Sequence, residues 1–165
     1  MPETTDDFAV VYAQHLPAVS AYLARRVARD DVDDLAADTF AIAWRKREQV
    51  AAGEELPWLY RIASYQVANH RRRLASRQSV MGLLSAPDSA PAADSFLDAD
   101  ARLARAWARL SAGEREVLAL VIVDDLPVAQ VAIALGATPN AVSIRLHRAK
   151  KALAAALSAE PDDAV

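Results

Sequence analysis

The chain has 165 residues, 53% of them hydrophobic, with four glycines, no cysteine and a net charge of −3. This length and composition allow one ordinary domain or two very small ones, favour helices, and exclude a disulfide framework or a thiolate metal site. Residues 1–7 lack the start of a signal peptide, and no window approaches the roughly 18 apolar residues of a membrane span. We therefore expect a soluble cytoplasmic protein that has no membrane partner.

The net charge conceals an uneven distribution of acids and bases. Residues 56–78 contain five arginines and no acid, and residues 126–159 contain four bases and no acid. Between them, residues 79–101 contain four aspartates and no base. Because the local field matters more than the total for contact with nucleic acid, the two basic zones are candidate DNA surfaces.

Apolar residues at three- and four-residue steps predict three helices in the first half of the chain. They extend over about residues 7–28, from residue 30 to about residue 46, and from Pro57 toward residue 73. Asp30 and Asp31 are expected to cap the second helix, and residues 49–56 to form a loop. Pro57 suits the first turn of the third helix, where its missing N–H is not needed.

The helical pattern fails between about Ser79 and Ala93, where the residues are small, polar and proline-bearing. Helices then resume with one that ends near Leu110, one opened by a capping box of Ser111 and Glu114, one over Val128–Leu135, and one from Pro139, for which Thr138 is the expected cap. The predicted fold is all-α, with two small helical domains over residues 1–78 and 97–159. A flexible acidic linker over residues 79–96 joins them, and residues 160–165 form a disordered tail.

Residues 128–149 follow the order of a helix-turn-helix. Val128, Val131, Ala132 and Leu135 are expected to be buried, Gly136 permits a positive φ in the turn, and Val142 and Leu146 face inward from the second helix. Such a helix fits the major groove of DNA. Any compact helical hairpin gives a similar pattern, but the absence of acids favours DNA. The candidate contacts are Thr138, Asn140, Ser143, Ile144, Arg145, His147, Arg148 and Lys150.

The second predicted helix combines an acidic first half with large aromatic residues. Five aspartates within residues 30–38 exceed what capping needs, and exposed acids beside apolar residues suit a protein partner with a basic surface. Phe40 and Trp44 also fit an ordinary core.

The third predicted helix carries aromatic, amide and arginine side chains without a carboxylate after its start. Arginines neutralise phosphates, and each aromatic ring stacked on an unpaired base contributes about 1–3 kcal/mol. This mixture suits opened DNA, although Trp58 also fits a core and the arginines also fit a solvated surface. The residues are Trp58, Tyr60, Arg61, Tyr65, Asn69, Arg71, Arg72 and Arg73.

The second and third predicted helices, followed by the helix-turn-helix, resemble in this order the extracytoplasmic-function (ECF) sigma factors of the sigma-70 family. Residues 34–45 are similar to the region-two helix that docks on the clamp helices of the polymerase β′ subunit, and residues 58–63 to the helix that leads into minus-ten recognition. Residues 110–118 and 132–149 are similar to region four, which reads the minus-thirty-five element. The resemblance covers about residues 7–157 apart from the linker.

The resemblance implies a promoter-specificity factor, not an enzyme, which needs no cofactor or metal. The implied partners are core RNA polymerase, through its β′ clamp helices and β flap, promoter DNA, and an anti-sigma factor that no residue identifies. The implied polymerase-binding residues are Asp34, Leu35, Asp38, Phe40 and Trp44. The third predicted helix would hold the minus-ten strand, and the last helix would read the minus-thirty-five element.

The chain departs from the family pattern mainly at base-reading positions. Ile144 stands where a serine is common, Tyr65 where an asparagine is common, and Pro127 where a serine usually caps the helix. These differences bear on the promoter sequence more than on the function. Two other readings stay open at this point, namely a stand-alone helix-turn-helix regulator and a helical module that sequesters a protein partner.

Overall fold

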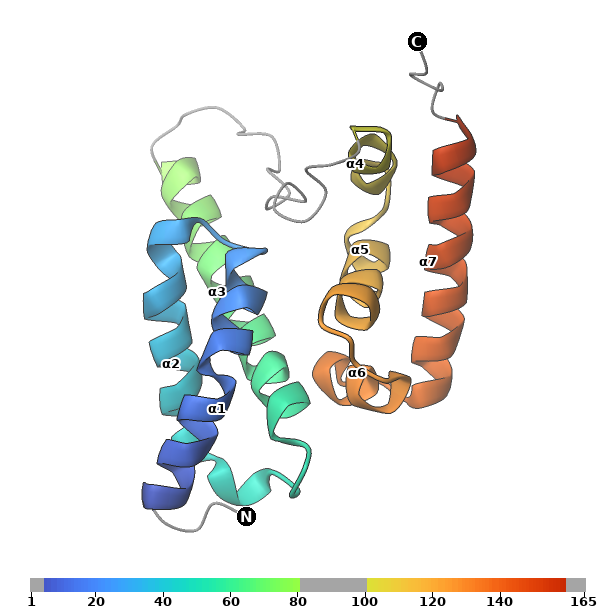
Figure 1. Cartoon of the computed structure of the whole chain (residues 1–165). Helices are drawn as coiled ribbons and strands as arrows, with labels where there is room; N and C mark the ends of the chain where they lie inside the picture. The colour runs from blue at the N-terminus through green and yellow to red at the C-terminus, as the bar shows by residue number, and fades with distance from the viewer. Residues whose placement is uncertain (1–4, 81–100, 160–165) are drawn as a thin grey trace. The chain divides into compact units, whose positions relative to one another are not determined.

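The computed structural model describes residues 5–80 and 101–159. Every regular element within these two ranges is helical, which confirms the all-α prediction. The chain divides into two compact units, and each is described by itself (Figure 1). Most of the predicted linker, the beginning of the second predicted domain and the predicted tail lie outside the described residues.

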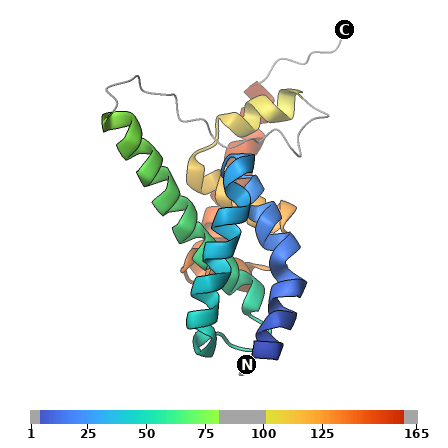
Figure 2. The same cartoon turned by 90° about the vertical axis from the view of Figure 1, so that its left-hand side faces the viewer.

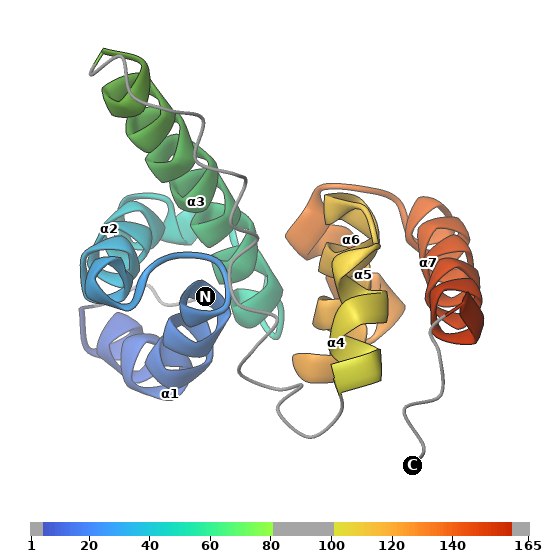
Figure 3. The same cartoon turned by 90° about the horizontal axis from the view of Figure 1, so that it is seen from above.

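The first unit consists of α1 (Thr5–Ala24), α2 (Val32–Arg45) and α3 (Glu55–Val80), and each helix contacts the other two. In the view of Figure 3, α1 and α2 lie next to each other and α3 runs at an angle to both. Figure 2 shows the C-terminal part of α3 extending away from the other two helices. The following core residues are at most 3% exposed: Val19, Leu23, Leu35, Ala43, Leu59 and Ala63.

Helix α1 ends at Ala24, four residues before the predicted end at Ala28. The guanidinium of Arg26 lies 3.5 Å from the centre of the Tyr22 ring, and its Nη1 donates a hydrogen bond to Tyr22 O at 2.8 Å. The side chain thus satisfies a carbonyl that a continuing helix would have used. Ala28 is already extended, with φ −61° and ψ 146°.

The expectation that Asp30 and Asp31 cap α2 is wrong. Residues Arg29–Asp31 form a 3-10 turn, and the N-cap residue Asp31 makes no side-chain hydrogen bond to the helix start. Its Oδ2 instead accepts a hydrogen bond from Nε2 of His70 on α3, at 3.1 Å. The Asp31 carboxylate, which the local pattern assigns to capping, therefore binds a distant residue instead. This hydrogen bond connects the start of α2 to α3.

Helix α3 begins two residues before Pro57, so Pro57 lies in the first turn as predicted and is fully buried. The helix continues to Val80, so Ser79 and Val80, predicted to begin the linker, are helical. The loop before it contains a 3-10 turn, Arg47–Gln49, and Gly53 with φ 84°. Residues 71–78 are all exposed, which makes the end of α3 a solvent-facing arm.

The second unit consists of α4 (Ala101–Ala108), α5 (Ala112–Leu118), one π-helical turn (Ala119–Val123), α6 (Val128–Leu135) and α7 (Pro139–Ala159). Helices α4, α5 and α6 all contact the long α7 (Figure 1). The π-helical turn was not predicted, and Asp125 after it has φ 53°. The core residues at most 1% exposed are Ala106, Val117, Leu118, Leu120, Val131, Val142 and Ala149.

The local signals of the predicted helix-turn-helix are confirmed. The N–H of Glu114 donates to Ser111 Oγ at 3.2 Å, and the N–H of Ser111 donates to Glu114 Oε2 at 2.8 Å, which completes the capping box. Gly136 adopts φ 61° and ψ 37° in the turn. The N–H of Ala141 donates to Thr138 Oγ1 at 3.1 Å, so Thr138 caps α7.

The buried face of α6 differs slightly from its prediction. Val131 and Ala132 are buried as predicted, together with Ala134, which was not predicted. Val128 and Leu135 are only half-buried. The helix has few residues and packs against α7, so the covered face is set by the partner helix as well as by the spacing of its apolar residues.

Candidate functional site

Five of the predicted minus-ten residues lie along one face of α3. Arg61, Tyr65, Asn69 and Arg72 are spaced by four, four and three residues, and Trp58 precedes Arg61 by three, so a helical repeat of 3.6 aligns them. Tyr65 is 56% exposed, and Nη2 of Arg72 donates a hydrogen bond to Asn69 Oδ1 at 2.5 Å. The face therefore offers two exposed cations and one exposed aromatic ring.

A hollow of about 510 Å³ lies beside this face, between α2 and α3. Trp58, Arg61 and Tyr65 line it on the α3 side. Lys46, which follows α2, and Gln49, in the 3-10 turn, line the opposite side and were not predicted. Aromatic rings, amides and cations around one hollow are the chemistry that holds a flat, hydrogen-bonding ring attached to a phosphate.

Three members of the predicted minus-ten set point elsewhere, and one of them, Arg73, lines a second hollow. Tyr60 is 2% exposed, and its ring stacks on that of Tyr22 with centroids 4.7 Å apart and an interplanar angle of 16°. The expectation that Tyr60 stacks on a base is therefore corrected. Nη2 of Arg71 donates to Arg26 O at 3.2 Å, so Arg71 holds the chain after α1. Neighbouring residues of a helix point about 100° apart, which residue type alone does not reveal.

Three of the five predicted polymerase-binding residues are packed into the first unit. Leu35 is 3% exposed and Phe40 is 4% exposed, so neither presents a surface to a partner, and this expectation is corrected. Trp44 is half-buried, with the Phe8 ring edge-on at 5.1 Å and the Arg47 guanidinium 3.9 Å from its centre. Asp34 and Asp38 are the members of the set that are exposed.

A second hollow, of about 390 Å³, has an acidic wall and a basic wall. Asp31, Asp34 and Asp38 come from the α2 side. His70, Arg73 and Arg77 come from α3, and the apolar part includes Leu35 and Leu74. We call this hollow the bipolar groove. The sequence assigned Asp34 to a protein partner and Arg73 to DNA, whereas the structure places both along one groove.

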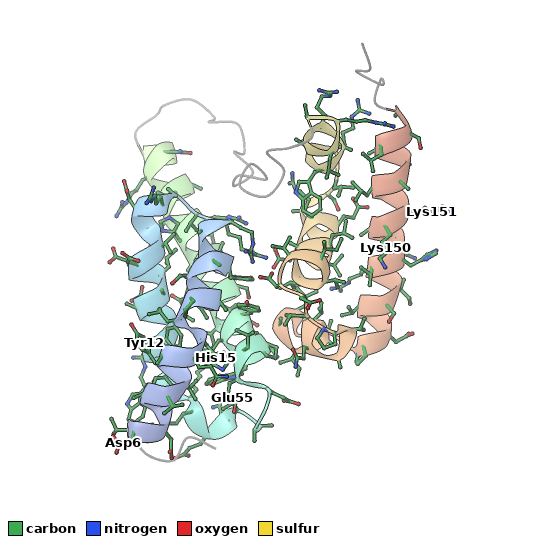
Figure 4. The ribbon with its side chains drawn as sticks, in the orientation of Figure 1. Asp6, Tyr12, His15, Glu55, Lys150 and Lys151 are labelled. Carbon is green, nitrogen blue, oxygen red and sulfur yellow. The ribbon has the colours of Figure 1, made fainter. Side chains whose placement is uncertain are left out.

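The predicted minus-thirty-five residues all lie on the exposed surface of α7 or at its start. The positions from Asn140 to Lys150 in the predicted set are exposed, whereas Val142 and Ala149 are fully buried on the other side of the helix. Figure 4 shows Lys150 and Lys151 projecting from α7. Thr138 is exposed but its hydroxyl is engaged in the cap.

The position of α7 is fixed at its far end by a residue that the sequence did not single out. Nε and Nη2 of Arg102 on α4 donate hydrogen bonds to Leu157 O at 3.2 and 2.8 Å. A cation that binds a terminal carbonyl also complements the negative end of the helix dipole. An arginine 55 residues away carries no sequence signal of this role.

One histidine of the first unit has a perturbed proton affinity. His15 on α1 lies close to Glu55 at the start of α3 (Figure 4). Partial burial lowers the pKa of His15 from 6.5, and the nearby Glu55 carboxylate opposes this shift. The neutral imidazole is therefore the form that the folded unit favours.

Within residues 5–80 and 101–159, no three or more histidine, aspartate or glutamate side chains gather as metal ligands. No helix in the described parts of the chain combines the length and the apolar character needed to cross a membrane.

Comparison with known proteins identifies the family. The family model described as "Sigma-70 region 2" matches residues 11–78, and the one described as "Sigma-70, region 4" matches residues 100–153. The chain is 31% identical over 150 residues to the RNA polymerase sigma factor CarQ of Myxococcus xanthus. This match covers 87% of this chain and 84% of that protein. It is 31% identical over 142 residues to the ECF RNA polymerase sigma factor SigF of Caulobacter vibrioides, with coverage of 81% and 76%.

Two solved structures of sigma factors are also similar to this chain. The sigma factor RpoE from Bartonella quintana, solved in complex with the anti-sigma factor NepR, is 25% identical with a TM-score of 0.68, and the match covers 95% of this chain and 100% of that one. CnrH, solved in complex with the cytosolic domain of CnrY, is 26% identical with a TM-score of 0.64, and the match covers 96% and 92%.

An all-α chain with a helix-turn-helix and these matches is a transcription initiation factor of the sigma-70 type. The chain belongs to the ECF RNA polymerase sigma factors. It binds RNA polymerase and directs initiation of transcription at specific promoters, and the stand-alone regulator is not favoured. Its relatives are named as sigma factors, not as enzymes.

Proposed function

We propose that α7 reads the upstream, minus-thirty-five element in the major groove, that α3 holds the opened minus-ten strand, and that α2 docks on the polymerase. The observation that carries this proposal is the outward face of α7. It follows a confirmed helix-turn-helix turn, all of its predicted contact residues are exposed, and residues 126–159 contain no acid that would repel phosphate. The chain contributes binding, and the chemistry of RNA synthesis belongs to the polymerase.

The minus-ten role is supported by the hollow beside α3. A base that leaves the helix loses stacking and pairing worth a few kcal/mol. Tyr65 and the exposed part of Trp58 offer aromatic surface, and Arg61 offers a cation for the neighbouring phosphate. Stacking at about 1–3 kcal/mol per base together with phosphate contacts offsets the cost of extrusion. Tyr60, which is buried, holds the helix in place and does not touch the strand, and Arg71 bonds to Arg26 O.

The polymerase role is supported by the exposed carboxylates of α2. Asp34 and Asp38 lie on the acidic wall of the bipolar groove, and buried Leu35 and Phe40 anchor the helix. Complementary charge speeds encounter and fixes the register of a partner with basic residues. RpoE and CnrH were solved with NepR and the cytosolic domain of CnrY, and we propose that an anti-sigma factor likewise regulates this chain.

Transcription with purified core polymerase tests the proposal. The chain plus core polymerase is expected to give specific transcripts from a genomic template, and the chain alone to bind promoter duplex weakly. The paired variant Arg145→Gln with Arg148→Gln should weaken promoter binding. It should also reduce by about 2 the slope with which the logarithm of the binding constant falls against the logarithm of the salt concentration, because each phosphate contact contributes about 0.9 to that slope. Arg29→Gln, an exposed arginine of the first unit, is the matched control.

Two results would contradict the proposal. The first is the absence of any specific transcript with core polymerase. The second is tight, polymerase-independent binding to a palindromic duplex, which would favour a stand-alone regulator. An unchanged salt slope in the arginine pair would remove α7 from the DNA interface while leaving the family assignment intact.

A further inference from the structure

One large apolar side chain interrupts the polar outer face of α7. Ile144 is 46% exposed and lies in the second turn of the helix. At 3.6 residues per turn it points away from Val142 and Ala149, both fully buried, and shares the centre of the outer face with Asn140 and His147. Both of these polar neighbours are exposed.

A single exposed hydrophobic residue is ordinary on a protein surface, so exposure alone carries no conclusion. The position of Ile144 makes it different. It lies near the N-terminal end of the second helix of a helix-turn-helix, which is the part that approaches base edges most closely. Its χ1 angle is restricted because the side chain is β-branched, so its methyl groups are held in few orientations.

The chemistry of the major groove limits what Ile144 can recognise. An isoleucine side chain neither donates nor accepts a hydrogen bond, so it gains nothing from the polar edges of guanine, cytosine or adenine. The 5-methyl group of thymine is the apolar group that a base pair presents in this groove.

We propose that Ile144 packs against the 5-methyl group of a thymine in the upstream promoter element and thereby selects a T·A pair at one position. The inference rests on the proposed placement of α7 in the major groove. It assigns a base-specific role to a residue that makes no hydrogen bond, whereas Arg145 and Lys150 on the edges of the same face serve phosphates. Covering one methyl group changes affinity about fourfold.

Deoxyuridine provides the test, because it differs from thymidine by that methyl group alone. The promoter is first mapped with the holoenzyme, and each thymine of the upstream element, on either strand, is then replaced singly by deoxyuridine. The readout is the concentration of holoenzyme that gives half-maximal open complex. We expect one position at which the wild-type holoenzyme loses about three- to fivefold, and Ile144→Ala should bind the thymine template as weakly as the wild type binds the uridine template.

The decisive quantity is the ratio of affinities for the two templates. Ile144→Ala should lower this ratio to about 1, whereas Ser143→Ala, a neighbouring exposed change, should keep the wild-type ratio whatever it does to overall affinity. The inference is overturned if no thymine shows a methyl effect or if Ile144→Ala retains it. Specific transcription without a methyl effect overturns this inference alone. Absence of specific transcription overturns the proposed function and this inference together.

Discussion

Gly113 and Gly136 of the second unit should respond to the same substitution with opposite signs. Gly136 ends α6 with φ 61° and ψ 37°, in the left-handed region that a Cβ atom disfavours. Gly113 lies in the first turn of α5, its φ is not positive, and nothing lies within 4 Å of a Cβ placed there. One glycine is therefore required by the turn of the helix-turn-helix and the other is not.

The expected magnitudes follow from the backbone. A non-glycine residue in the left-handed region costs roughly 1–2 kcal/mol, and removal of glycine from the unfolded chain returns about 0.4–1 kcal/mol. Gly136→Ala should therefore lower the free energy of unfolding by about 1 kcal/mol, and Gly113→Ala should raise it by roughly 0.5 kcal/mol. Gly136→Asn is the matched control, because asparagine adopts this conformation more readily than alanine.

Urea unfolding of the full chain measures the difference. Trp107 is 6% exposed and belongs to the second unit, so its fluorescence reports on that unit once Trp44 and Trp58 are replaced by phenylalanine. With a slope of about 1–3 kcal/mol per molar urea, the midpoints of the two alanine variants should differ by roughly 0.5–1.5 M. A Gly136→Ala chain as stable as its parent, or a Gly113→Ala chain less stable, would refute the reasoning.

Three further predictions concern charges and caps. Because burial lowers the pKa of His15, the unfolded chain binds more protons than the folded one near pH 6. The first unit should thus lose stability as pH falls through 6.5, and His15→Gln should flatten this dependence in pH-resolved urea titrations; an unchanged slope would contradict it. Asp34→Asn and Asp38→Asn should each weaken core polymerase binding by about 0.5–1 kcal/mol at low salt, with Asp6→Asn on α1 as the control, and equal effects at all three would remove the docking assignment. Ser111→Ala should lower the stability of the second unit by about 1 kcal/mol by removing one half of the capping box, and an unshifted midpoint would show that solvent replaces this cap.

Local chemistry explains why much of the second unit was predictable. The capping box of Ser111 and Glu114, the glycine turn at Gly136 and the Thr138 cap each depend on residues within a few positions of one another. These short-range features depend on neighbouring residues of the chain rather than on distant ones, so the pattern predicted them correctly. The π-helical turn Ala119–Val123 had no such signal.

In the first unit, local sequence patterns did not predict the partners of several side chains. Asp31 has the residue type and position of a helix cap, yet it pairs with His70, which is 39 residues away. Tyr60 and Arg71 have the residue types of a DNA contact, yet one is stacked inside the unit and the other bonds to Arg26 O. Residue type indicated which chemistry was available, and the packing of α1 and the start of α2 against α3 decided where it was used.

The sequence by itself determined the all-α class, most helix positions and the acid-free surface of the last helix, because these follow from periodicity, caps and charge along the chain. The tertiary structure alone decided which of the named residues share a surface. It placed Asp34 and Arg73 along one groove, brought Lys46 and Gln49 beside Trp58, and fixed the end of α7 through Arg102. The physical reason is that a helix presents its residues in directions about 100° apart, and only contact with another helix determines which of those directions face solvent.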